Sequence, residues 1–297
     1  MRHKTAFSFL EISIVLIVIS LIMAGVMEAS KLVKSSRLAN ARTITGKSIV
    51  PDIKGLVAWF ETSLSDSLKA SENYDGAQIS TWYDVSPSSI ILKKNSLSKS
   101  ASAGVTFVSD GINNIGSLKF SGSGNDSSND TGSKISLSGF YQGSSARNTI
   151  FIVFRPTVLP SSYSRIFIDS GTGATSTAGL AANNSVYFNL GSNSNTATAS
   201  NPANFAGDQN YILAIYFNGA NSKAYLNNVN QMAGDALVNP GSNPLNGLTI
   251  GSDKNGGYSF NGLISEIIIY NRPIQNSERK DIFRYLSDKY KIPVLGF

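Results

Sequence analysis

The sequence predicts a long N-terminal α-helix followed by an all-β antiparallel sandwich and a short C-terminal helix. Three observations support this fold class. Residues 7–27 are uncharged apart from Glu11, and most of them are Ile, Leu, Val or Phe. After Asp52, short apolar or alternating segments are separated by turns rich in Gly, Asn, Ser and Asp. Near the end of the chain, Phe283, Leu286 and Tyr290 recur at helical spacing.

The first helix is predicted to run from Phe7 to about Thr45, because Gly46 and Pro51 are stop signals. Residues 7–27 suffice to cross a hydrocarbon core of about 30 Å. The basic residues at positions 2–4 favour a cytoplasmic N-terminus. The whole helix would be about 60 Å long. The part beyond the bilayer would either carry the next domain clear of the membrane or pack into a filament core.

Glu11 separates three interpretations of this segment. A secretory signal peptide would have the carboxylate inside its apolar region, and no clean A-x-A cleavage site follows. A plain signal anchor leaves the carboxylate unexplained, since an ionised side chain in a bilayer costs several kcal/mol near the middle and less near the edge. The third interpretation gives the carboxylate a function.

The segment "AFSFLEISIVLIVISLIMAGV" after a short basic leader resembles the N-terminus of type IV prepilins and pseudopilins. The resemblance implies that a prepilin peptidase cuts between Ala6 and Phe7, that the new N-terminus is methylated, and that Glu11 is the fifth mature residue. Glu11 would neutralise the ammonium of Phe7, because two buried charges are tolerated only as a pair. Two departures are Ala6, where the family usually has Gly, and Glu28, where major pilins commonly have Pro.

The middle of the chain is predicted to be β-structure throughout. No long helical pattern interrupts it, which favours an antiparallel sandwich. "YFNGANSKAYLNN" indicates a hairpin. The expected strands are GLVAWF, ISTWYDV, GVTFVS, SLKFSG, KISLSG, TIFIVF, RIFIDS, SVYFNLG, YILAIYF, KAYLNN, LTIGS and LISEIIIY.

The order of these segments over residues 52–297 resembles a LamG-like, concanavalin A-like jelly roll. Its most specific part is the closing block, in which a strand ends at Tyr270 before a helix capped by Asn276 or Ser277, with Glu278 in its first turn. One face of that helix is expected to lie on the sandwich. The predicted organisation is a leader at 1–6, a transmembrane and assembly helix at 7–47, a linker at 48–55 and the jelly-roll domain at 56–297.

Composition excludes several kinds of chemistry. The chain has no cysteine, and its one histidine is His3. Disulfides, thiol catalysis and thiolate metal sites are therefore excluded, and a leaderless form would also lack Ser-His-Asp catalysis and histidine-ligated zinc. The net charge of +6 comes partly from residues that flank the apolar run. We interpret them as a solvated helix face and expect no nucleic-acid partner.

Few residues of the predicted sandwich stand out as a site. Trp59, Trp82 and Phe154 are expected to fill the core rather than stack on sugars, and Asp84 is expected to cap a turn. No cofactor and no metal site is predicted, although Asp84, Asp110 or Asp169 would be calcium ligands if one existed, since related folds sometimes hold calcium with Asp and carbonyl oxygens. "SGTGATSTAG" at 170–179 is interpreted as a loop and not as a phosphate cradle.

Catalysis is not expected. Laminarinase-like glycosidases with this jelly roll place paired carboxylates on one strand through an E-x-D-x-x-E signature. The signature is absent, and none of the glutamates of this domain stands in that pattern: Glu61, Glu72, Glu266 and Glu278.

The sequence therefore predicts a minor pilin or pseudopilin, processed at Ala6–Phe7 and assembled through its N-terminal helix. It would sit in the inner membrane before assembly and in a periplasmic or cell-surface filament afterwards. Its expected partners are prepilin peptidase, other pilin or pseudopilin subunits and a glycan or protein ligand of the jelly roll. The alternative is a signal-anchored binding module outside any filament. The choice between a pilus, a secretion pseudopilus and a DNA-uptake machine stays open.

Overall fold

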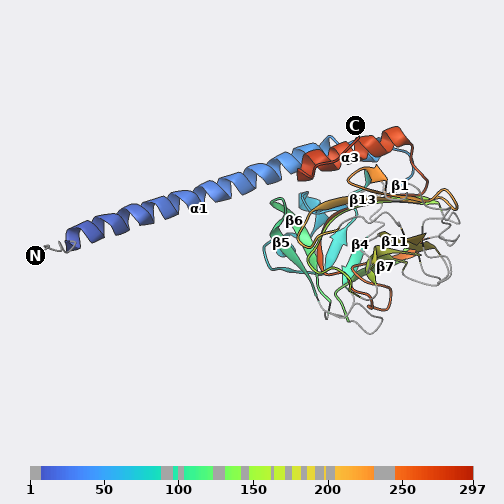
Figure 1. The fold of residues 1–297 in the computed structure, drawn as a ribbon, viewed down its shortest axis with the longest axis horizontal. Helices are drawn as coiled ribbons and strands as arrows, with labels where there is room; N and C mark the ends of the chain where they lie inside the picture. The colour runs from blue at the N-terminus through green and yellow to red at the C-terminus, as the bar shows by residue number, and fades with distance from the viewer. Residues whose placement is uncertain are drawn as a thin grey trace, which may run out of the picture.

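The computed structural model shows a long helix that projects from a β-sandwich (Figure 1). A second helix, α3, lies beside the C-terminal part of the first, α1, and both rest on one face of the sandwich. This arrangement confirms the predicted fold class. The structure describes residues 8–87, 96–99, 104–122, 131–141, 147–161, 164–170, 176–181, 186–190, 197–198, 205–230 and 245–296.

Helix α1 spans Phe9–Gly46 and ends at the glycine that the sequence marks as a stop. Its N-cap is Ser8, whose backbone N–H donates to the Glu11 carboxylate at 2.8 Å. An acidic side chain in the first turn satisfies a free amide and interacts favourably with the helix dipole. The helix therefore begins with a local cap and needs no tertiary contact there.

The sandwich consists of two antiparallel sheets. Sheet A has the order β15-β14-β13-β8-β17-β6-β5-β2, and β1 also pairs with β17. Its strands are β15 Val229–Asn230, β14 Lys223–Leu226, β13 Tyr211–Phe217, β8 Asn148–Pro156, β17 Gly262–Tyr270, β6 Ile115–Phe120, β5 Val105–Ile112, β2 Gln78–Ile79 and β1 Leu56–Glu61.

Sheet B has the order β12-β11-β10-β9-β16-β7-β4-β3. Its strands are β12 Ala197–Thr198, β11 Val186–Leu190, β10 Ser176–Ala181, β9 Ser164–Asp169, β16 Asn246–Ile250, β7 Ile135–Tyr141, β4 Ser96–Lys99 and β3 Thr81–Tyr83. Three short 3₁₀ turns, η1 Val50–Asp52, η2 Ser65–Ser67 and η3 Ala70–Glu72, connect the early elements.

The molecule has three layers because sheet A is buried on both faces. Along β8, Ile150, Ile152 and Phe154 point into the core between the sheets, whereas Phe151 and Val153 point towards the helices. This alternation follows from the two-residue period of a strand. Sheet B is consequently the layer farthest from α1 and α3.

Helix α3, Asn276–Tyr290, covers the outer face of sheet A. Phe283, Leu286 and Tyr290 are fully buried, as the sequence predicts. The predicted cap was wrong: the helix begins at Asn276, and the residue before it donates its N–H to Glu278 at 2.6 Å. Glu278 lies in the first turn as expected, and its long side chain reaches back to accept the N–H of the residue that precedes the helix.

All twelve predicted strand segments contain strands, and the predicted hairpin joins β13 to β14. The interpretation of residues 170–179 as a loop was wrong in its second half, because Ser176 begins β10. Residues 171–175 lie outside the described part of the chain. The strand "STAGLA" carries little apolar alternation, and its position depends on pairing with β9 and β11.

Shortening Ile282 to valine is expected to lower the free energy of unfolding by about 1 kcal/mol, because the side chain is fully buried between α3 and sheet A. Thermal unfolding of the full chain in detergent, followed by circular dichroism, measures this change. The matched variant Val158→Ala removes methyl groups from a side chain that is 45% exposed and is expected to shift the transition much less. Equal shifts would contradict the buried position of α3.

Candidate functional site

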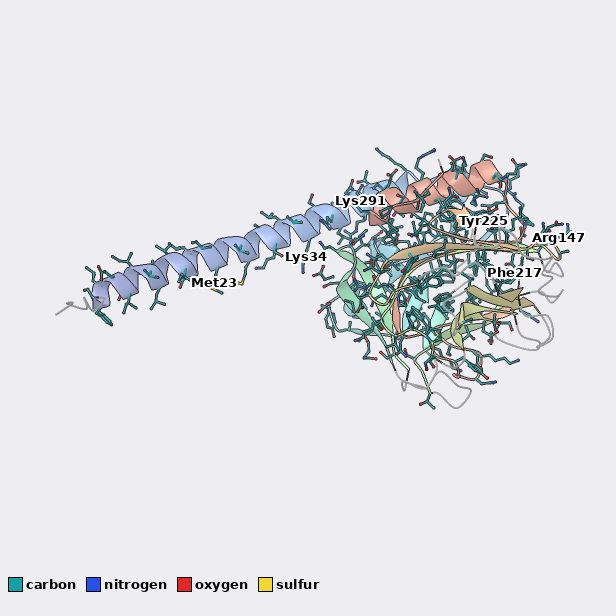
Figure 2. The ribbon with its side chains drawn as sticks, viewed as in Figure 1. Met23, Lys34, Arg147, Phe217, Tyr225 and Lys291 are labelled. Atoms are coloured by element: carbon teal, nitrogen blue, oxygen red, sulfur yellow. The ribbon has the colours of Figure 1, made fainter. Side chains whose placement is uncertain are left out.

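The first candidate site is the free part of α1, residues 9–33. Its side chains are exposed almost without exception, with Phe9 86% and Leu21 68% exposed. Figure 2 shows Met23 pointing into open space, whereas Lys34 lies where the helix meets the sandwich. In the described part of the chain this is the one helix long and apolar enough to cross a membrane. Such a surface requires lipid or other helices to cover it.

The polar groups inside this apolar segment satisfy themselves. The hydroxyl of Ser13 donates to the carbonyl of Phe9, and that of Ser20 donates to the carbonyl of Leu16, each at 2.8 Å. In a hydrocarbon environment every polar group needs an internal partner. The two serines therefore do not hinder burial of the segment in lipid or in a helix bundle.

Glu11 is exposed near the start of the free segment and has Ser8 as its partner. The predicted processing residues, Ala6 and Phe7, lie outside the described residues. Processing at Ala6–Phe7 and the assembly role of Glu11 therefore stay predictions.

Contact between α1 and the sandwich begins at Lys34. The Lys34 ammonium pairs with Asp110 of β5 at 2.8 Å, and Arg37 donates to the carbonyl of Asn113 at the β5–β6 turn at 3.3 Å. Five residues after Arg37, Arg42 Nε donates to the carbonyl of Ser63 at 2.7 Å. The helix is therefore free on one side of Lys34 and docked on the other.

Beneath the docked part lies a polar cluster that we call the junction network: Trp59, Glu61, Glu266, Tyr285, Lys289 and Tyr290. Glu61 of β1 and Glu266 of β17 are opposite each other across the sheet. The Lys289 ammonium lies between their carboxylates, at 2.9 Å from Glu61 and 2.8 Å from Glu266. All three side chains are completely inaccessible to solvent.

Every carboxylate oxygen in the network has donors. Glu266 accepts hydrogen bonds from the indole N–H of Trp59 at 2.7 Å and from the hydroxyls of Tyr285 and Tyr290 at 2.7 and 2.9 Å. Glu61 accepts bonds from the backbone N–H groups of residues 63 and 64 at 2.7 Å, and from the hydroxyls of Ser63 and Ser67. Dense hydrogen bonding of this kind offsets the cost of burying charge.

The electrostatics favour the ionised pair of Glu61 and Lys289. Burial acts to raise the pKa of Glu61, but the Lys289 ammonium and the serine hydroxyls outweigh it and hold that pKa below 4.5. Burial likewise acts to lower the pKa of Lys289, but Glu266 and Glu61 together raise it above 10.5. This cluster was not predicted from the sequence. The available signal was a glutamate in each of two apolar strands and a lysine on the apolar face of the last helix.

The second candidate site is the outer face of sheet B, which neither helix covers. Trp82 of β3 points into the core between the sheets, so Thr81 and Tyr83 point the other way. The strand register places Thr81 at one end of a row of polar residues that crosses the neighbouring strands. The row passes through Ser136 and Thr249 and ends at Asp169. Thr249 and Asp169 are covered, whereas Thr81, Tyr83 and Ser136 remain partly exposed.

The sandwich can be compared with known proteins at this point. Residues 127–278, about half of the chain, match a laminin G-type family model described as "Concanavalin A-like lectin/glucanases superfamily". The chain belongs to this concanavalin A-like superfamily. No curated protein matches its sequence.

Two solved structures with TM-scores above 0.5 share this fold. A Trypanosoma rangeli sialidase matches 80% of this chain with 16% identity and a TM-score of 0.51, and a mutant of it with trans-sialidase activity matches 86% with 14% identity and a TM-score of 0.53. The chain covers only 34% and 38% of those two proteins. Domain 4 of a Geobacillus stearothermophilus arabinanase, solved with arabinotriose, matches 77% of this chain and 98% of its own length, with 17% identity and a TM-score of 0.48.

The two facing carboxylates of this concanavalin A-like domain do not form a hydrolase site. A glycosidase needs its carboxylates on either side of a bond in a substrate. Here Glu61 and Glu266 share a lysine between them, and no solvent reaches any of the three. The lysine and the surrounding hydrogen-bond donors stabilise the buried carboxylates, and the arrangement leaves no solvent-accessible space for a sugar.

The other residues that the sequence analysis singled out are structural. Trp59, Trp82 and Phe154 are buried, which confirms their assignment to the core. Asp84 accepts the N–H of Ser86 at 2.9 Å and thereby caps a turn as predicted.

The three candidate calcium ligands have different partners and are not brought together. Asp84 also accepts the N–H of Trp59, Asp110 pairs with Lys34, and Asp169 accepts two backbone N–H groups at 2.7 and 2.8 Å. Burial raises the pKa of Asp169 to about 6. Among the described residues no group of three or more His, Asp or Glu side chains is placed to hold a metal.

Proposed function

We propose that this chain is a type IV pilin-like subunit, a minor pilin or pseudopilin, that displays a concanavalin A-like domain. The observation that carries the proposal is the free segment of α1, which projects away from the sandwich and carries no charged side chain between residues 12 and 27. Residues 9–27 extend about 28 Å, close to the thickness of a bilayer core. The segment fits a membrane before assembly and a bundle of like helices afterwards.

The position of Glu11 favours assembly over simple anchoring. Its carboxylate already reaches back to the N–H of Ser8 at 2.8 Å. A cut between Ala6 and Phe7 would place a new ammonium one residue before that N–H. The pair would then carry no net charge, which makes burial of the helix end in a bundle tolerable. In a plain anchor the carboxylate would serve only to cap the first turn of α1.

Mass spectrometry of the N-terminus tests this proposal on protein purified from its native cells. A chain that begins at Phe7 with one added methyl group on its amine supports processing by prepilin peptidase. A chain that begins at Met1 contradicts the pilin proposal and leaves the alternative of a signal-anchored surface module. A start near Ser30 also contradicts it, and identifies a secreted sandwich.

We further propose that the outer face of sheet B binds a glycan. The superfamily to which the chain belongs includes lectins by its description. Both helices cover sheet A, whereas sheet B presents hydroxyl groups beside Tyr83 at its β3 end. Sugars are bound by such combinations of polar groups with an aromatic surface.

The variant Tyr83→Ala is expected to weaken glycan binding at least about tenfold, since it removes the aromatic surface next to this row. Binding of the full chain in detergent micelles to a glycan array, followed by titration of the best hit, measures the effect. Tyr74→Ala is the matched control, because Tyr74 is 63% exposed and lies outside sheet B. An equal loss in both variants, or none in Tyr83→Ala, would contradict this location.

A further inference from the structure

The segment that connects α1 to the sandwich is packed and hydrogen-bonded against the sandwich. Residues 48–55 include η1, and Val50 and Ile53 of this segment are buried. The Val50 carbonyl accepts the hydroxyl of Tyr270 at 2.9 Å, and the Lys54 carbonyl accepts Arg272 Nε at 2.8 Å. The segment that the sequence suggested as a linker is therefore held along its length by β17 and the turn that follows it.

The docked part of α1 is held at two places along its axis. The first is the β5–β6 turn, where Asn113 contacts both helices: its carbonyl accepts Arg37, and its side chain donates to the carbonyl of Tyr290 at 2.6 Å. The second is at Arg42 and Thr45, which contact Ser63 above the junction network. Arg37 and Thr45 are about 12 Å apart along the helix. Two supports at this separation oppose tilting of the helix in either direction.

The junction network specifies a single position of α3 over sheet A, which apolar packing alone does not. An apolar interface tolerates small displacements of a helix over a sheet, because one apolar contact replaces another. Displacing α3 over sheet A would instead separate Lys289 from two carboxylates that no solvent can reach. A buried charge without its partner is strongly unfavourable, so such networks specify one arrangement even where they add little stability.

Helix α1 reaches the junction network through Thr45, whose hydroxyl lies 3.5 Å from the hydroxyls of Tyr285 and of Ser63, the latter a donor to Glu61. We propose that the junction network, through this contact, is a rigid joint that fixes one angle between α1 and the sandwich. Helix and sandwich then move as one body, with the outer face of sheet B directed away from the axis of α1 (Figure 1). In a filament whose core consists of α1 helices, this angle places sheet B on the outside. The rigidity itself does not depend on the pilin proposal, because it would also hold for a membrane anchor.

Distances between pairs of spin labels test the joint. The chain has no cysteine, so Ala29→Cys in α1 and Ser138→Cys in β7, both exposed positions, give two unique labels in the full chain in lipid nanodiscs. The expected result is a single narrow distance distribution. The combined variant Glu61→Gln, Glu266→Gln, Lys289→Met keeps side chains of similar size without charge, and is expected to broaden that distribution at least twofold.

Two controls separate loss of the joint from loss of the fold. A label pair within the sandwich, at exposed positions 138 and 223, must stay narrow in the combined variant. Lys34→Gln removes an ion pair that is nearly half exposed and is expected to leave the α1-to-sandwich distribution narrow. A broad distribution in the unchanged chain would overturn the proposal. So would an unchanged distribution in the combined variant with an intact sandwich.

A further variant keeps the test decisive if the combined variant does not fold. Arg42→Gln with Thr45→Val leaves the three charged groups in place and removes the contacts of α1 with Ser63. Broadening in this variant supports the joint, and an unchanged narrow distribution overturns it. N-terminal processing is measured separately, so failure of the pilin proposal and failure of the joint give different results.

Discussion

Replacing Lys289 with methionine is expected to lower the free energy of unfolding by about 3–5 kcal/mol. The change leaves the carboxylates of Glu61 and Glu266 facing each other in a place that solvent does not reach. Methionine fills a similar volume, so the loss is electrostatic and not a cavity effect. Thermal unfolding in detergent measures it, and Trp59 fluorescence reports the site directly because the indole donates to Glu266.

The matched controls distinguish a buried pairing from an ordinary ion pair. Arg284→Gln breaks the exposed pair of Arg284 with Asp281 and is expected to cost less than about 1 kcal/mol. The combined variant Glu61→Gln, Glu266→Gln, Lys289→Met removes all three charges and should recover much of the lost stability, since neutral side chains avoid the desolvation cost. If Lys289→Met were as mild as Arg284→Gln, the network would not be buried as described.

The pH dependence of stability should follow the same charges. The pKa of Glu61 is lowered on folding, so its contribution is complete above its unfolded value and is lost as the pH falls below about 4. The pKa of Lys289 is raised, so its contribution is complete below its unfolded value and is lost as the pH rises beyond about 10. The difference in melting temperature between the unchanged chain and the neutral combined variant, measured from pH 3 to pH 11, isolates these charges from Asp169, whose raised pKa acts in both proteins, and should plateau between these limits. The melting temperature of the neutral combined variant should change less than that of the unchanged chain below about pH 4 and above about pH 10.

Replacing Glu11 with alanine is expected to abolish entry into filaments while insertion into the membrane continues. The apolar segment alone suffices for insertion, and the variant makes it more apolar. Assembly into a helix bundle would then bury the mature N-terminal ammonium without a counter-charge. Quantitative immunoblots of sheared filaments and of membranes from native cells measure the two steps, and the expected loss from filaments is at least about tenfold by analogy with a buried unpaired charge.

Glu28→Ala is the matched control for Glu11. Glu28 lies on the same helix but is exposed and pairs with Lys31 at 2.8 Å. Its removal is expected to change filament entry by less than about twofold, because exposed pairs contribute little. Normal assembly of Glu11→Ala would contradict the assembly role of this carboxylate, whereas absence of the unchanged chain from filaments would favour a simple membrane anchor.

The local spacing of apolar residues predicted most of the helices and strands of this chain. The free part of α1 is long and apolar enough that no tertiary contact is needed to define it, and Gly46 ends it where the sequence indicates. Large apolar residues at a period of two located strands such as β8 and β17, which are buried on both faces. Strand β10 was missed because Ser, Thr, Ala and Gly carry no such pattern, and the cap of α3 was misplaced because Glu278 reaches back past Asn276.

The sequence by itself determined the apolar helix, the sandwich, the closing helix and the burial of Trp59, Trp82 and Phe154, because each depends on the kind and spacing of neighbouring residues. Only the tertiary structure decided that Glu61 and Glu266 meet Lys289, and that α1 is docked from Lys34 onward. These contacts join segments separated by up to 228 residues. Their geometry depends on strand register and on the seating of α3, which no local periodicity encodes.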